Sequence, residues 1–154
     1  MAVNSIPGKI IGVMDGGKWL NCQVDATLNL TVDVTEEDPC KPDPDDEEQG
    51  EVPFKFRTAD ARDWSIDFSQ KLMRDSLAAA NVDYGEEFVD GRLDRQVQFM
   101  TAPGQTKSNY DIIYAGSGIL TAHTVNAPAV GAGTTDTSIA GNGPLTYSKV
   151  PVTT

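Results

Sequence analysis

The sequence is poor in the residues from which most catalytic and metal sites are built. Its 154 residues include one histidine, His123, and two cysteines, Cys22 and Cys40. A structural zinc site normally takes four Cys or His ligands, so we expect no metal centre. Two cysteines are also too few for a disulfide scaffold. Cys22 falls in the inward set of an alternating segment, where a thiol behaves as a small hydrophobe, and we expect both cysteines to be free.

Basic residues are scarce and long apolar runs are missing. The chain has 12 Lys and Arg against 23 Asp and Glu, which gives a formal net charge of −11. Phosphate contacts need clustered Lys and Arg, so this balance argues against a nucleic-acid binder. No apolar run approaches the roughly 20 residues of a membrane helix. The N-terminus lacks the basic and apolar regions of a signal peptide, and we expect synthesis in the cytoplasm without membrane insertion.

The short motifs do not predict catalysis or cofactor binding. No cysteine stands beside His123 in sequence, and a surface or pore-facing imidazole is favoured over a catalytic base. The acidic stretch from Asp43 has Glu48 where a calcium-binding EF-hand loop requires glycine. The segments "GSGILT" and "GNGPLT" end in threonine where a dinucleotide fingerprint needs Gly or Ala. We therefore expect no enzyme, no cofactor and no metal.

What the chain has is alternation. From Cys22 to Val34 every second residue is apolar or small, and the residues between them are polar and partly acidic. This pattern predicts a long strand with one dry and one wet face. A typical strand has about 5–6 residues, so we expect this one to extend beyond its own core. Asp15-Gly16-Gly17 predicts a tight hairpin turn that joins a first strand to the long one.

The remaining segments predict a mainly-β fold with one helix. "DWSIDF", residues 63–68, reads as a core strand, and the spacing of apolar residues over 69–81 predicts a helix. Two longer strands follow, joined by "APGQTKSN", with a bend at 115–118 in the second. The last strand carries a bulge at 141–143. Together these elements predict a single domain over residues 1–154, a β-sandwich or partial barrel with one flanking α-helix.

Residues 35–51 interrupt this pattern with acidic residues and prolines. Pro39, Pro42 and Pro44 remove backbone donors, and the crowded carboxylates repel one another. We predict a long acidic loop at about 35–60, inserted within the single domain. Loops longer than about 12–15 residues are uncommon inside compact domains and are often functional or disordered.

The C-terminal third, "YDIIYAGSGILTAHTVNAPAVGAGTTDTSIAGNGPLT", resembles the major tail tube proteins of long, flexible-tailed bacteriophages. The matching pieces are Asn126-Ala127-Pro128, Gly131 to Asp136, and Gly141 to Thr146. Upstream, the Asp-Gly-Gly hairpin, the long loop, the "DWSIDF" strand and the single helix follow in the same order. The acidity and the prolines of residues 35–51 depart from the family's pattern.

This resemblance implies a structural virion protein. In that family a small β-sandwich with one helix joins six-membered rings, and the rings stack head to tail into the tail tube. Long strands contribute to an inner β-barrel shared by the subunits, and the tube conducts DNA and the tape measure protein during genome delivery. The implied partners are copies of the same chain, the tape measure protein, and the tail terminator and initiator proteins. The implied location is the virion tail, after synthesis in the host bacterial cytoplasm.

The charge of the chain adds two site hypotheses. A lumen lined with Lys or Arg would hold DNA phosphates, whereas an acidic or neutral lumen lets DNA pass without specific binding. Asp25 and Asp33, on the polar face of the long strand, are our candidates for the lumen. The acidic loop is our candidate for the ring-to-ring contact, with the residues Glu36, Glu37, Asp38, Asp43, Asp45, Asp46, Glu47 and Glu48.

Two alternatives stay open at this point. A virion decoration or receptor-binding β-sandwich module would expose aromatic anchors on loops. The aromatic residues here fall largely on strand-like segments, which favours the tube. The inner tube of a contractile tail or secretion machine uses similar subunit logic, and the sequence separates it poorly from a flexible tail.

Overall fold

The structure is a computed structural model that describes residues 8–20, 22–37, 54–72, 82–101 and 110–151. Its elements are η1 (Gly8–Ile10), β1 (Ile11–Asp15), β2 (Lys18–Trp19), β3 (Gln23–Glu37), β4 (Phe56–Lys71), α2 (Tyr84–Val89), β5 (Asp94–Thr101), β6 (Tyr110–Asn126) and β7 (Thr134–Pro151). The chain divides into two compact units. We call residues 1–29 and 64–154 the body and residues 30–63 the hairpin unit, and we describe each by itself.

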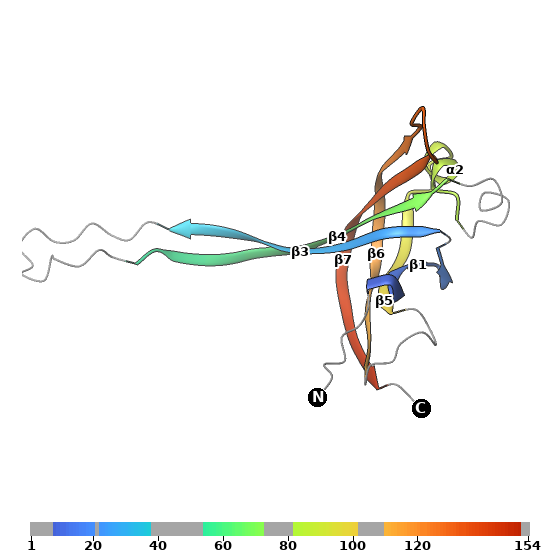
Figure 1. Cartoon of the computed structure of the whole chain (residues 1–154). Coiled ribbons are helices and arrows are strands. Elements are labelled where there is room, and N and C mark those ends of the chain that lie inside the picture. Colours follow the sequence, from blue (N-terminus) through green and yellow to red (C-terminus); the bar gives the residue numbers. More distant parts are fainter. Residues whose placement is uncertain (1–7, 21, 38–53, 73–81, 102–109, 152–154) are drawn as a thin grey trace, which may run out of the picture. The chain divides into compact units, whose positions relative to one another are not determined.

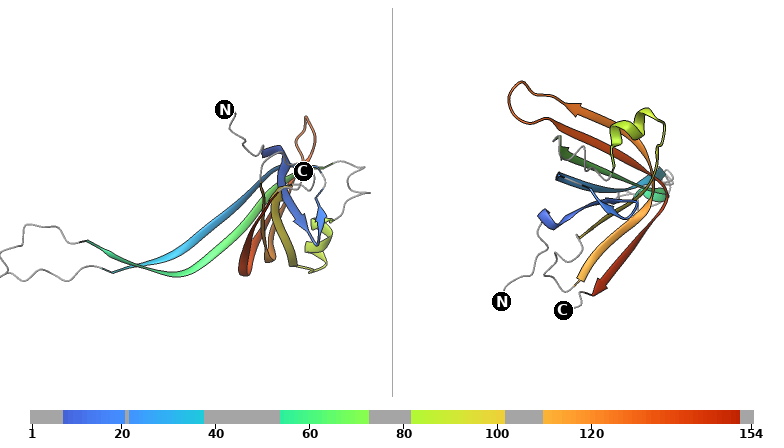
Figure 2. Two further views of the ribbon diagram at one scale, coloured as in Figure 1. Left: turned by 90° about the horizontal axis from the view of Figure 1, so that it is seen from below. Right: turned by 90° about the vertical axis from the view of Figure 1, so that its right-hand side faces the viewer.

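Seven strands form one antiparallel sheet in the order β2-β1-β5-β6-β7-β4-β3 (Figure 1). The longest pairing joins β6 to β7, from Tyr110 opposite Pro151 to Asn126 opposite Thr134. Within the body the sheet is strongly curved (Figure 2), and α2 lies against β6. The prediction of a mainly-β fold with one helix is confirmed, and the strands form one curved, open antiparallel sheet.

The core of the body lies on the face of the sheet that α2 covers. Each strand contributes alternate side chains, because successive residues point to opposite faces. Full burial of such a side chain stabilises the fold by about 1.5–3 kcal/mol. The buried hydrophobic cluster consists of Val13, Leu20, Trp64, Ile66, Phe68, Tyr84, Val97, Leu120 and Ile139.

The helix predicted over residues 69–81 is wrong at its start. Ser69, Gln70 and Lys71 continue β4 and pair with β7, opposite residues 136 to 134. The intrinsic helix propensity of these residues is weak compared with the stabilisation that an extended backbone gains by pairing with β7. Residues 73–81 lie outside the described residues. The helix that the structure does show, α2, begins after the predicted range, and Asp83 caps its N-terminus by accepting hydrogen bonds from Gly85 and Glu86.

The loop predicted at about 35–60 is strand at both ends, because β3 runs to Glu37 and β4 begins at Phe56. The Glu36 carboxylate lies 3.0 Å from Arg57 and 3.5 Å from Lys55. Opposite charges across the hairpin therefore favour the extended strand at Glu36. Residues 38–53 lie outside the described residues.

The first hairpin turn is confirmed, since Gly16 and Gly17 both have positive φ, at 60° and 81°. The long strand does not follow it directly, because β2 ends at Trp19 and β3 begins at Gln23. The inward position predicted for Cys22 is wrong. Cys22 is exposed, with φ at 56°, so the chain changes direction there before the strand starts.

Both irregularities predicted in the C-terminal strands are confirmed. The β6–β7 register moves from Gly116 opposite Leu145 to Gly118 opposite Gly141, so β7 carries extra residues 142–144 at this point. A second shift lies between Leu120 and Ala122 of β6. Extra residues of this kind bend a strand and increase its twist, which fits the curvature of the sheet.

Candidate functional site: interaction surfaces of the sheet

The glycine-rich segments of β6 and β7 form a socket for one tryptophan. A Cβ atom at Gly141 would lie 2.4 Å from the indole Nε1 of Trp64, and one at Gly116 would lie 2.7 Å from its Cζ2. A Cβ at Gly118 would lie 2.5 Å from Ile139. The indole, 5% exposed, donates a hydrogen bond of 3.1 Å to the carbonyl oxygen of Gly143. The segments "AGSG" and "GNG" therefore make room for Trp64 in the core.

The side chain of Gln23, at the start of β3, connects this strand to β1 and to Leu20. The Val13 N–H donates to Oε1 of Gln23 at 2.8 Å, and Nε2 of Gln23 donates to the Val13 and Leu20 carbonyls at 3.0 and 2.9 Å. The amide thus takes the place of a neighbouring strand at the edge of β1. A Cβ atom at Gly12 would lie 2.6 Å from that Oε1, so a larger residue there would displace the glutamine amide.

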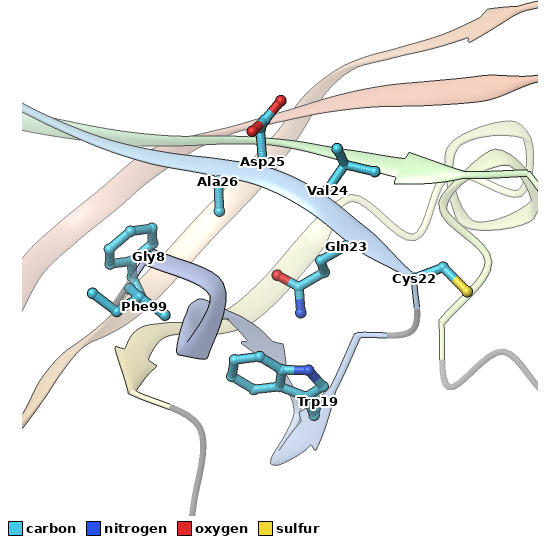
Figure 3. Close-up of a pocket in the computed structure, with 9 residues that line it drawn as sticks. Gly8, Trp19, Cys22, Gln23, Val24, Asp25, Ala26 and Phe99 are labelled. Atoms are coloured by element: carbon cyan, nitrogen blue, oxygen red, sulfur yellow. The ribbon is translucent and has the colours of Figure 1, made fainter. Parts of the chain in front are cut away.

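An open hollow of about 710 Å³ lies beside this joint (Figure 3). Gln23 and Ala26 point from β3 toward Trp19 and Phe99, whereas the Val24 and Asp25 side chains point to the other side of the strand. Two consecutive residues on one side interrupt the alternation expected from the sequence. The lining residues are Gly8, Ile11, Trp19, Cys22, Gln23, Val24, Asp25, Ala26 and Phe99. They bring no group of catalytic side chains together, and the part of the chain that the structure describes holds no group of three His, Cys, Asp or Glu able to bind a metal.

Helix α2 is held to the sheet by a network of charges. Asp15, 2% exposed, accepts from the Tyr84 hydroxyl at 2.7 Å and from Arg95 at 2.9 and 3.3 Å. Arg95 also donates to Glu87 at 2.9 Å, and Arg92 binds the same carboxylate at 2.8 and 3.2 Å. No sequence pattern predicts these pairings, because most of the partners are far apart along the chain.

The network changes the pKa values of its members. Burial, followed by the charge of Asp15, raises the pKa of Tyr84 well above its ordinary value. The hydrogen bond from Arg92 lowers the pKa of Glu87. Burial alone would lower the pKa of Arg95, but its hydrogen bond and charge interaction with Asp15 raise it. The three groups therefore keep their ordinary protonation states at neutral pH and act as fixed charges and donors.

His123 lies beneath the N-terminus of α2 and is half-buried. Its Nδ1 lies 2.9 Å from the Thr137 hydroxyl, and its Nε2 lies close to Gly85. Burial lowers its pKa, with Asp83 acting in the opposite direction. A neutral imidazole packed between helix and sheet is therefore a structural element of the helix contact.

The outer face of the sheet, opposite the core, carries a row of polar side chains. Asp67 accepts from Asn29 at 3.0 Å and from Ser138 at 2.6 Å. Asp136 accepts from Ser69 at 2.6 Å and from Asn126 at 2.7 Å, and these bonds lower its pKa. The alternation of Ser65, Asp67 and Ser69 in the sequence was the signal for this row. Ser69 had instead been placed at the start of the helix predicted over residues 69–81.

The two lumen candidates, Asp25 and Asp33, are both exposed on β3. Asp25 belongs to the body and Asp33 to the hairpin unit. Among the ring-to-ring candidates, Glu36 and Glu37 are exposed at the end of β3, and Glu36 is the one paired with Lys55 and Arg57. The other six candidates, Asp38, Asp43, Asp45, Asp46, Glu47 and Glu48, lie outside the described residues.

The hairpin unit has one apolar face. Leu30, Val32 and Val34 are 59%, 48% and 46% exposed. Glu36 follows on the same side of β3 and binds Arg57 of β4. Thr31, Asp33 and Thr35 lie on the other face. A two-stranded ribbon cannot cover an apolar face by itself, and an exposed apolar patch of this kind is typical of an interaction site.

The sheet also has strand edges without a neighbour. In the described part of the chain, β4 pairs with β7 only from Thr134 to Ala140, so Leu145–Pro151 have β6 on one side alone. β3 is the last strand of the sheet order. Unpaired N–H and C=O groups along such edges are templates for pairing with another strand.

Comparison with known proteins shows the fold through solved structures. No protein-family model matches the sequence, and no curated protein matches it. A chain in the virion of a native gene transfer agent particle is similar, with a TM-score of 0.61 and 14% identity over 92% of this chain and 98% of that one. A chain in the tail of an empty gene transfer agent particle, refined with C6 symmetry, gives the same values. A chain in the six-fold symmetrised baseplate of the anti-feeding prophage has a TM-score of 0.58 and 9% identity, over 96% and 97%. The protein therefore shares its fold with chains of tail and baseplate particles. Among the described residues no helix is long and apolar enough to cross a membrane.

Proposed function

We propose that this protein is a structural tail subunit that assembles into six-membered rings, which stack into a tube conducting DNA. The observation that carries the proposal is the likeness to a gene transfer agent tail with C6 symmetry, which extends over 92% of the chain. The likeness to the anti-feeding prophage baseplate, six-fold symmetrised, supports a ring of the same order. A likeness that spans nearly the whole chain leaves little of it for a separate activity, so we propose a structural protein and not an enzyme.

The exposed surfaces support self-association. Leu30, Val32 and Val34 are each about half exposed, and covering them would stabilise an assembly by roughly 3 kcal/mol per subunit, taking about 1 kcal/mol for each. A second copy of the chain brings the same face and the same open edges. Closure of a ring leaves no terminal subunit, so every edge and every apolar face finds a partner.

The charge of the chain supports passage of DNA without binding. Duplex DNA carries one negative charge per about 1.7 Å of its axis, and the net charge of −11 means that a subunit repels it. Screening limits this repulsion to about 8–10 Å at ordinary salt, so only residues on the inner wall contribute. We propose Asp25 and Asp33 for that wall. A solved tube with both carboxylates on its outer surface would contradict this assignment.

The same model assigns the other partners and the location. We propose that the acidic segment from Glu36 to Glu48 makes the contact between successive rings. The tape measure protein would occupy the lumen, and terminator and initiator proteins would bind the two ends of the tube. The subunit would be made in the cytoplasm of a bacterial host and function in the virion tail. Tube growth that survives deletion of residues 36–50 would contradict the role of the acidic segment.

The test is assembly of the purified protein and of two matched variants. Negative-stain electron microscopy of concentrated protein should show six-fold rings or hollow tubes, and light scattering should show their mass. Val32→Lys places a charge on the apolar face of the hairpin unit and should leave dispersed subunits. Thr31→Lys places the same charge on the opposite face and should still assemble. A wild-type protein that stays monomeric or trimeric, even in a kosmotropic salt that strengthens apolar contacts, would overturn the proposal.

A further inference from the structure

We infer that Asn142 is a site of spontaneous deamidation, at which the folded protein slowly acquires an aspartate or isoaspartate next to the Trp64 socket. Asn142 is followed by Gly143, and this is the only Asn-Gly pair in the sequence. Asn142 is exposed. It belongs to residues 142–144 of β7, which have no paired residue in β6. The inference concerns the chemistry of the body and does not depend on the proposed assembly.

The reaction needs no catalyst or co-reactant other than water. The backbone nitrogen of Gly143 attacks the side-chain carbonyl carbon of Asn142 and forms a five-membered succinimide. The bond from that carbon to the side-chain amide nitrogen breaks, and the nitrogen leaves as ammonia with the proton of the Gly143 N–H. Water then opens the ring at one of its two carbonyls. One opening gives aspartate, and the other gives isoaspartate, in which the main chain runs through the side-chain carbon.

The local geometry favours ring closure at this position. Gly143 has no side chain to hinder its nitrogen, and its φ of +107° shows a backbone that departs from the regular strand. The extra residues between Gly141 and Leu145 are not paired with residues of β6, so the ladder does not hold them at fixed positions. Among the hydrogen bonds that the structure describes, none involves the amide of Asn142.

Two other asparagines of the described chain are natural comparisons. Asn29 donates to Asp67 at 3.0 Å and precedes Leu30, whose branched side chain hinders the attacking nitrogen. Asn126 donates to Asp136 at 2.7 Å and precedes Ala127. Both amides are held by a carboxylate that would have to release them before a ring could close. Asn142 lacks both restraints, so we expect it to react several-fold faster than either.

The product changes the core contact beside it. The carbonyl of Gly143 accepts the hydrogen bond of the Trp64 indole at 3.1 Å. An isoaspartate at position 142 adds a carbon to the backbone one residue before this carbonyl, so we expect the acceptor to move. Either product also adds one negative charge per subunit. The extent of deamidation at Asn142 is therefore coupled to the packing of Trp64.

The test follows amide loss in the folded protein at mildly alkaline pH and physiological temperature. Peptide mapping by mass spectrometry reads Asn29, Asn126 and Asn142 in one sample, and enzymatic methylation of isoaspartate quantifies the rearranged product. Asn142→Gln is the matched control, because its longer side chain would have to close a six-membered ring. Asn142→Asp supplies the charge of the product without the rearranged backbone. Fluorescence in a Trp19→Phe background reports on Trp64 in each protein.

We expect faster amide loss at Asn142 than at Asn126, and a change in Trp64 fluorescence that follows isoaspartate in wild type and is absent from Asn142→Gln. Freshly purified Asn142→Asp, measured before its own Asp-Gly bond can close to the same succinimide, should retain the fluorescence of fresh wild type. If Asn142 in the folded protein reacts no faster than Asn126, while it reacts readily in urea, the bulge protects it and the inference is wrong. Isoaspartate that accumulates without a change at Trp64 would refute the coupling to the core.

Discussion

Replacing Gly141 with alanine tests whether the glycines of β6 and β7 exist to hold Trp64. The added Cβ would lie 2.4, 2.5 and 2.7 Å from three atoms of the indole, and none of these contacts is possible without movement. The indole is 5% exposed and is also bound to the Gly143 carbonyl, so it cannot move toward solvent freely. Overpacking of a core typically costs about 1–3 kcal/mol, and a displaced hydrogen bond adds about 1 kcal/mol. We expect the free energy of unfolding to fall by about 2–4 kcal/mol.

Urea denaturation measures this change directly. With a denaturant dependence of about 2 kcal/mol per molar, the midpoint should fall by about 1–2 M. Gly8→Ala is the matched control, because a Cβ at Gly8 meets nothing within 4 Å, and its effect should stay within about 0.5 kcal/mol. In a Trp64→Phe background, which has a smaller ring, Gly141→Ala should cost less, by a coupling free energy in the range of about 0.5–3 kcal/mol. A Gly141→Ala protein that unfolds at the same urea concentration as Gly8→Ala would refute the socket.

Three further predictions concern the contacts that close the body. Gln23→Ala removes the partners of the Val13 N–H and carbonyl, and we expect a loss of about 1–3 kcal/mol in urea unfolding, whereas Thr27→Ala, an exposed residue of the same strand, should be nearly neutral. Tyr84→Phe keeps the ring but removes the hydroxyl that donates to the buried Asp15, and we expect a loss of about 1–3 kcal/mol at constant denaturant dependence; an unchanged midpoint would show that Arg95 alone satisfies Asp15. The pKa of Glu87 is lower in the folded protein than its ordinary value of 4.5, so its ion pairs stabilise the fold above that pH and lose their effect as the pH falls through the folded pKa. The stability difference between wild type and Glu87→Gln should therefore shrink in acid, while Glu86→Gln, whose carboxylate is 64% exposed and 3.9 Å from Arg92, should show little difference at any pH.

The sequence predicted those parts of the fold that depend on local signals. Alternation identified the strands around Trp64, Ile66 and Phe68, and the Gly16-Gly17 pair identified the first turn. The helix assignment failed at Ser69 because the deciding interaction is the pairing of β4 with β7, which lies more than 60 residues away along the chain. The inward position of Cys22 failed for a related reason. The alternation resumes only at Ala26, and the cause is the contact of Gln23 with β1, which no periodicity records.

The candidate site was accessible to sequence analysis only in part. The alternation that marks Asp25 and Asp33 as polar also marks Val32 and Val34 as apolar, but it does not say that the apolar side lacks a cover. Whether the apolar side is covered depends on which strands lie beside β3, and this is a property of the whole sheet. The charge network around Asp15 was equally out of reach, because its members come from β1, α2 and β5 and share no spacing.

The glycines of the C-terminal third have a role in folding. Gly116, Gly118 and Gly141 lie against Trp64 and Ile139, where an added Cβ atom would clash with the core. Exposed faces such as that of Leu30, Val32 and Val34 need only apolar alternation, which many residue types provide. A fold of this kind can therefore keep a small set of steric positions and change most of the rest. We therefore expect Val32→Ile, which preserves the apolar face, to leave folding and the proposed assembly unchanged, whereas Gly118→Ala should destabilise the chain itself.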